Sequence, residues 1–113
     1  MQFGIFTVGD LTTDPTTGRT PTEHERIKNT VAIAMKAEEI GLDVFATGEH
    51  HNPPFIPSAP TTTLAYIGAL TKRLILSTST TLITTTDPVR NRRGLRDPST
   101  SGRRASRPDA GAR

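Results

Sequence analysis

The sequence predicts an α/β fold built around a parallel β-sheet. Three short apolar segments alternate along the chain with two segments of helical periodicity, and consecutive strand–helix units of this kind pair their strands in parallel. The chain has 113 residues, of which 33% are hydrophobic, so we expect at most one small domain with a modest core. A complete βα barrel, which typically takes about 250 residues, does not fit this length.

The first strand–helix unit begins at the N-terminus. Gln2–Val8 is an apolar run that predicts a buried strand, and the polar stretch Gly9–Arg19 predicts a loop. Thr20 is the expected N-cap of the next helix, with proline at the first helical position and Glu23 as the capping-box partner. Gly41 is the expected C-terminal stop. The core-facing side chains predicted from helical spacing are Ile27, Val31, Ala34 and Ile40.

Two more strands and a second helix follow. Asp43–Thr47 and Leu74–Thr78 are short apolar runs typical of buried strands, and Thr61–Thr71 between them has helical spacing. The core-facing residues of that helix are expected to be Leu64, Ile67 and Leu70. Asp87-Pro88 then has the pattern of another helix start, an N-cap followed by proline.

The last segment differs in composition from the rest of the chain. Residues 1–90 carry a net charge of −2 and residues 91–113 one of +5, so the basic pI of about 10.0 comes wholly from the end of the chain. No helical or strand period continues there, and we expect Asn91–Arg113 to be a disordered basic tail. Clustered arginines bind the phosphate groups of nucleic acids, but residues 91–113 contain no aromatic residue that could stack on bases. A small α/β module whose basic tail binds nucleic acid is therefore the competing interpretation.

Composition also excludes several classes of protein. With no cysteine, neither a disulfide framework nor a thiolate zinc site can form. The N-terminus lacks the basic and apolar regions of a secretory signal, and no apolar run approaches the roughly 20 residues that span a bilayer. We expect a cytoplasmic protein without membrane contact.

The candidate site follows the second and third predicted strands. Glu49, His50 and His51 come directly after the second strand, and the carboxyl ends of strands carry the chemistry of α/β sheets and barrels. The residues alone leave three interpretations open: acid/base catalysis by an imidazole, a metal site that needs a further ligand, or a polar loop. Ser79 and Thr80, after the third strand, are either hydrogen-bonding groups for a ligand or strand residues whose hydroxyls meet water.

Five short motifs occur in order along residues 1–90. They are M-Q-F-G-I-F at 1–6, A-E-E-I-G-L-D at 37–43, E-H-H at 49–51, L-I-L-S-T at 74–78 and D-P-V-R at 87–90. Each motif is weak alone, but the ordered set is specific. On these motifs the chain resembles the bacterial luciferase-like flavin-dependent monooxygenases.

The resemblance implies a fold and a reaction. The fold is a partial TIM (β/α) barrel, about the first three βα units, followed by the basic tail. The family binds reduced flavin and uses O2 to oxidise a small organic substrate such as an aldehyde. FMN is the expected cofactor, and a deazaflavin that transfers hydride is the alternative. A separate flavin reductase is an expected partner, and the intact form is expected to be a homo- or heterodimer.

The resemblance also assigns roles to the candidate residues. His50 falls on the family's active-site histidine, an acid/base near the flavin. Glu49, His51, Ser79 and Thr80 are expected to bind the cofactor, and no metal is implied. The bond between Ser79 and Thr80 falls where the family often has a cis peptide that does not involve proline.

A shifted reading frame explains the tail. After D-P-V-R the family continues with a helix and a fourth strand, whose patterns include I-A-E-D-Y-A and D-L-M-L-G-R. Codons for residues 91–96 can encode the first pattern when they are read one base later, and codons for residues 107–113 can encode the second. We therefore expect a single-base change near codon 90, in the gene or in its sequencing. On this hypothesis the barrel is truncated and this chain alone has no monooxygenase activity.

Overall fold

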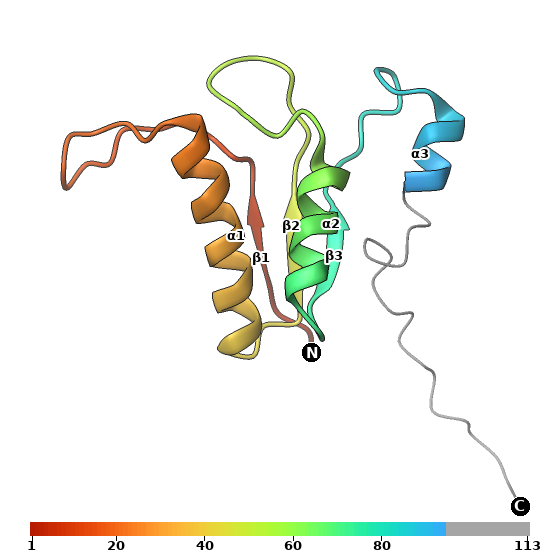
Figure 1. The fold of residues 1–113 in the computed structure, drawn as a ribbon, viewed down its shortest axis with the longest axis horizontal. Helices are drawn as coiled ribbons and strands as arrows, with labels where there is room; N and C mark the ends of the chain where they lie inside the picture. The colour runs from red at the N-terminus through yellow and green to blue at the C-terminus, as the bar shows by residue number, and fades with distance from the viewer. Residues whose placement is uncertain (95–113) are drawn as a thin grey trace, which may run out of the picture.

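A computed structural model describes residues 1–94 of the chain, in which strands and helices alternate (Figure 1). The elements are β1 (Gly4–Thr7), α1 (Glu23–Glu39), β2 (Val44–Thr47), α2 (Pro60–Leu70), β3 (Ile75–Thr78) and α3 (Pro88–Gly94). The strands form one parallel sheet in the order β1-β2-β3. This topology confirms the predicted α/β class and is compatible with the first part of a barrel.

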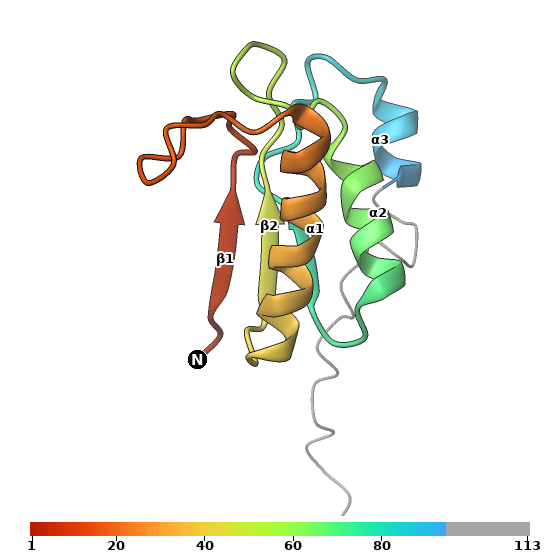
Figure 2. The same cartoon turned by 60° about the vertical axis from the view of Figure 1, so that its left-hand side comes forward.

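Helices α1 and α2 pack on the same face of the sheet (Figures 1 and 2). Side chains alternate between the two faces of a strand, so Phe45 and Leu76, which are in register, share the face that the helices cover. The buried core consists of Ala34, Ala37, Phe45, Leu64, Ile67, Leu74 and Leu76. The core therefore lies between the sheet and the two helices.

The opposite face of the sheet is covered by none of the helices that the structure describes. Phe6, Ala46 and Ser77 are in register on this face, and Phe6 is 52% exposed. In a βα barrel the face opposite the helices lines the interior. These three residues thus lie where a barrel places its inner side chains.

The N-cap of helix α1 lies two residues after the predicted position. Thr22 is the N-cap: its hydroxyl accepts the Glu25 N–H at 3.2 Å, and the Glu25 carboxylate accepts the Thr22 N–H at 2.8 Å. The prediction of Thr20 with Glu23 is therefore wrong. The segment T-P-T-E-H-E contains two overlapping capping patterns, and the Arg19 guanidinium favours the second because it pairs with Glu25 at 3.0 Å.

The buried stripe of α1 differs in part from the predicted one. It consists of Thr30, Ala34 and Ala37, and Val31 packs against the core beside it. The prediction is confirmed for Val31 and Ala34, but Ile27 is 49% exposed and Ile40 is 64% exposed. Ile27 lies on the flank of the stripe, and Ile40 is the C-cap, where helical spacing no longer applies.

Helix α2 starts at Pro60, one residue before the predicted start, with the proline in its first turn. Leu64 and Ile67 are buried as predicted. Leu70 is exposed instead, because it lies in the last turn and borders a hollow next to α1.

Helix α3 starts where the sequence predicts. The Asp87 carboxylate accepts the Arg90 N–H at 2.9 Å, which caps the first turn. The helix then continues to Gly94, so the prediction of a disordered tail is wrong for residues 91–94, and its remainder, residues 95–113, lies outside the described residues. None of the helices within residues 1–94 has the length and apolar character needed to cross a membrane.

Glu38 fixes the turn that leads into β3. Its carboxylate accepts three consecutive backbone N–H groups, from Lys72 at 3.0 Å, Arg73 at 2.7 Å and Leu74 at 2.8 Å. The Arg73 guanidinium donates in return to the Glu38 carbonyl oxygen at 2.6 Å. The hydrogen bond from the Arg73 amide is the main cause that lowers the pKa of the Glu38 carboxyl, and burial opposes it. The end of α1 thus positions the start of β3.

Candidate functional site

The carboxyl ends of the three strands meet at one edge of the sheet. The register aligns Thr7, Thr47 and Thr78 as their last residues. Pairing continues for one residue beyond them, because the Gly48 N–H donates to the Thr7 carbonyl at 3.1 Å and the Ser79 N–H donates to the Thr47 carbonyl at 2.9 Å. The loops after β2 and β3 therefore leave the sheet side by side, and both carry predicted site residues.

His50 is held over this edge by the loop that follows β2. Its backbone N–H donates to the Pro57 carbonyl at 3.1 Å, and its ring stacks on Phe55 with ring centroids 4.3 Å apart. A methyl group placed on Gly48 would lie 3.6 Å from His50 Nε2 and 3.5 Å from the Ser79 carbonyl oxygen. The imidazole of His50 and the backbone of Ser79 thus face the same small space.

The loop after β1 supports the loop that carries His50. Asp10 and Phe55 form an isolated antiparallel bridge, and the Gly9 carbonyl accepts the Ile56 N–H at 3.1 Å. Arg26 of α1 holds Asp10 through an ion pair of 3.1 Å and a hydrogen bond of 2.9 Å to its carbonyl oxygen. The ring that stacks on His50 is therefore tied to α1 through the β1 loop.

Glu49 points into the protein and is only 6% exposed. One carboxylate oxygen accepts the Leu82 N–H at 3.0 Å. The other lies 2.9 Å from His51 Nε2 and accepts the Thr85 hydroxyl at 3.3 Å. Burial alone would raise the pKa of the Glu49 carboxyl, but the hydrogen bonds from Leu82, His51 and Thr85 outweigh burial and lower it. Its hydrogen bonds thus join the loop after β2 to the loop after β3.

The remaining predicted residues lie on the outer side of the same edge. Ser79 and Thr80 are exposed, and the peptide bond between them is cis, as the resemblance implies. The side chain of His51 is 44% exposed. The structure therefore brings His50 together with Ser79, whereas Glu49 and His51 pair with each other.

Three residues that build this edge were not predicted from the sequence. They are Phe55, Leu82 and Thr85. Phe55 could have been singled out because it is an aromatic residue in a proline-rich loop, close in sequence to a candidate catalytic histidine. Leu82 contributes only its backbone N–H, which leaves no sequence signal.

Gly48 lies between the His50 ring and the backbone of Ser79 at this edge. Gly48 is buried, and the Phe6 ring lies 3.6 Å from where its side chain would begin. Within residues 1–94, no three His, Asp or Glu side chains are grouped closely enough to hold a metal ion.

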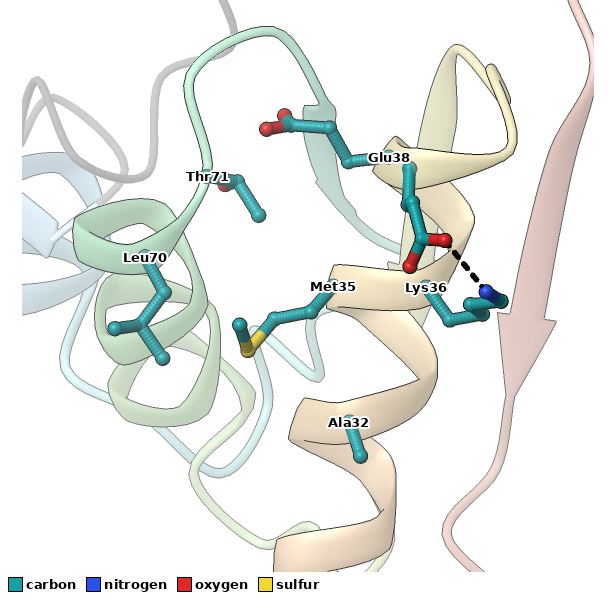
Figure 3. A pocket seen from close by; sticks show the side chains of 7 residues that line it. Ala32, Met35, Lys36, Glu38, Leu70 and Thr71 are labelled. Atoms are coloured by element: carbon teal, nitrogen blue, oxygen red, sulfur yellow. Dashed lines mark hydrogen bonds and ion pairs between the residues drawn. The ribbon is translucent and has the colours of Figure 1, made fainter.

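A separate hollow of about 460 Å³ lies between the C-terminal halves of α1 and α2 (Figure 3). Met35 and Leu70 supply its apolar wall, and its charged groups are engaged within the protein. Lys36 pairs with Glu39 at 2.6 Å, and the Glu38 carboxylate binds the turn before β3. The hollow therefore offers no free charged group to a ligand.

Comparison with known proteins supports the assignment made from the motifs. A family model described as luciferase-like monooxygenase matches residues 1–91. The match includes all three strands and every predicted site residue. No curated protein matches the chain.

Proposed function

This chain belongs to the luciferase-like monooxygenase family, and we propose that the edge around His50 is the flavin-binding part of its active site. The family acts on small molecules with O2 and generally depends on flavin. The observation that carries the proposal is the placement of His50 beside Ser79, at the carboxyl edge of a parallel sheet and next to Gly48. Active sites of βα barrels lie at this edge.

In this proposal each residue has a separate role. Phe6, which is exposed on the face of the sheet opposite the helices, supplies the surface against which the flavin ring lies. The exposed hydroxyls of Ser79 and Thr80, together with His51 at the rim, hydrogen-bond its polar edge. The bound reduced flavin supplies the electrons for the oxidation.

His50 has the proton-transfer role. Its backbone hydrogen bond to Pro57 and its stacking on Phe55 leave Nε2 directed at the space over Gly48. An imidazole can both accept and donate a proton near neutral pH, which suits a general acid/base.

The proposal names FMN as the flavin because the Glu49-His50-His51 loop resembles that of the monooxygenases, and a deazaflavin is the alternative. Since the flavin must arrive reduced, a separate flavin reductase is a proposed partner. The intact enzyme is proposed to be a homo- or heterodimer that oxidises a small organic substrate.

We also propose that residues 91–113 are translated from a shifted frame. The family match ends at residue 91, where the composition of the chain changes. A barrel site draws on several βα loops, and residues 1–94 supply three strands, so the edge around His50 is proposed as one part of that site. Resequencing the gene from codon 80 onward tests the proposal. A one-base correction that restores an open frame would support a sequencing error, whereas confirmation of the present frame would refute that version of the proposal.

Flavin binding to the purified chain tests the proposed site. Oxidised FMN is titrated with the wild type, His50→Ala and His24→Ala, and binding is followed by flavin fluorescence. We expect His50→Ala to weaken binding and His24→Ala to leave it unchanged, because His24 is exposed on the first turn of α1. Equal binding by all three chains would contradict the proposed site.

A further inference from the structure

A buried carboxylate joins the two loops that carry the proposed site. Glu49 precedes His50, and its side chain reaches the loop after β3, where it accepts the Leu82 N–H at 3.0 Å and the Thr85 hydroxyl at 3.3 Å. Ser79 is three residues before Leu82 in that loop. The hydrogen bonds of one side chain therefore connect the two segments that face each other across the site.

The hydrogen-bonding capacity of this carboxylate is used by the protein. Both oxygens have partners, one of them His51 Nε2 at 2.9 Å, and the side chain is 6% exposed. A buried ionised group is costly unless it is hydrogen-bonded in this way. A residue that orients neighbouring groups needs a buried carboxylate whose oxygens bind those groups. A direct contact with a cofactor would instead need a free carboxylate oxygen at the surface.

The buried apolar core does not include Glu49. That core lies between the sheet and helices α1 and α2 and is built from apolar side chains such as Phe45 and Leu76. Glu49 lies beyond the last residue of β2, at the edge where the loops begin. Loss of its carboxylate should therefore release the loops while the sheet persists.

We propose that Glu49 is a positioning residue, whose buried carboxylate holds the Ser79–Leu82 segment against the loop of His50 and so fixes the geometry of the flavin site. This inference rests on the proposed function. It replaces the direct cofactor contact expected for Glu49 from the resemblance with an indirect role.

The first test measures positioning in the full 113-residue chain by NMR, without flavin. The variants are Glu49→Ala, Glu49→Gln and the control Glu23→Ala, which removes an exposed carboxylate at the start of α1. In Glu49→Ala we expect the Leu82 amide to exchange with solvent about tenfold faster, or more, as follows from the loss of a hydrogen bond to a charged acceptor. We also expect loss of the nuclear Overhauser contacts between the His50 ring and Ser79. The amide shifts of β1 and β2 should stay unchanged.

Rescue by the conservative variant separates positioning from a general effect on folding. The side-chain oxygen of Glu49→Gln can still accept the Leu82 N–H, and His51 can change tautomer to suit the new amide. We expect this variant to restore both the slow Leu82 exchange and the contacts from His50 to Ser79. If Glu49→Ala keeps those contacts, or if Leu82 exchanges fast in the wild type, the positioning role is refuted.

An FMN titration of the same chains separates this inference from the proposed function. Weaker FMN binding by Glu49→Ala, restored in Glu49→Gln, supports both. If Glu49→Ala loses the loop contacts but binds FMN as the wild type does, the loops do not position a flavin and the inference is overturned. If the wild type shows the contacts but binds no FMN, the proposed flavin site fails, and with it the claim that Glu49 serves that site.

Discussion

Replacement of Glu38 by alanine should destabilise the fold more than the substitution of a surface residue usually does. The change removes the acceptor of three backbone N–H groups, from Lys72, Arg73 and Leu74. Water can replace the carboxylate at the two exposed amides, so each contributes about 0.5 kcal/mol, whereas the part-buried Leu74 amide contributes about 1 kcal/mol. The free energy of unfolding should therefore fall by about 2 kcal/mol, which lowers the Tm of a domain this size by about 8–16 °C.

Urea unfolding followed by circular dichroism measures this loss, and Glu39→Ala is its matched control. Glu39 is the next residue on α1 and makes an exposed ion pair with Lys36, so its removal should cost less than about 0.5 kcal/mol. The pH dependence supplies a second check. The pKa of Glu38 is lowered on folding, so its contribution is complete above the unfolded pKa and is lost as the pH falls through the folded value. Equal losses for Glu38→Ala and Glu39→Ala at neutral pH would refute this reasoning.

Two further predictions use pairs of matched substitutions and the same unfolding assay. Thr22→Ala should lower the free energy of unfolding by about 1 kcal/mol, because it removes the observed N-cap of α1. Thr20→Ala, at the N-cap position predicted from the sequence, should lower it much less. The reverse order would contradict the capping geometry. Gly9→Ala should be more destabilising than Gly18→Ala, although both glycines have a positive φ. The methyl group added at Gly9 would lie 2.7 Å from Pro57, whereas the one added at Gly18 would meet no atom within 4 Å. Equal losses would show that the loop relaxes around the clash.

The sequence was sufficient to predict the fold class and the order of its strands and helices. The apolar run Asp43–Thr47 and the helical spacing of Val31 and Ala34 reflect burial, so the β–α order could be predicted from them. The prediction of a buried strand is wrong for Gln2–Val8, because β1 forms there but is mostly exposed. The parallel pairing explains why the loops of His50 and Ser79 lie side by side, because parallel strands bring their carboxyl ends to one edge.

The helix start and the loop contacts could not be predicted in the same way. The choice between Thr20 and Thr22 depends on where Arg19 lies, which the local pattern does not specify. The burial of Glu49 depends on a backbone N–H in a loop more than thirty residues later in the chain. Hydrogen bonds between loops arise from tertiary geometry, and no periodicity in the sequence encodes them.

Mapping of FMN on the chain by NMR tests the central claim most directly. Oxidised FMN is added to the uniformly 15N-labelled chain, and the backbone amide shifts are followed through the titration. We predict perturbations at Gly48, His50, Ser79 and Thr80, with none at Met35 in the hollow between α1 and α2. Perturbations confined to that hollow, or none with FMN in large excess, would contradict a flavin site at the carboxyl edge of the sheet.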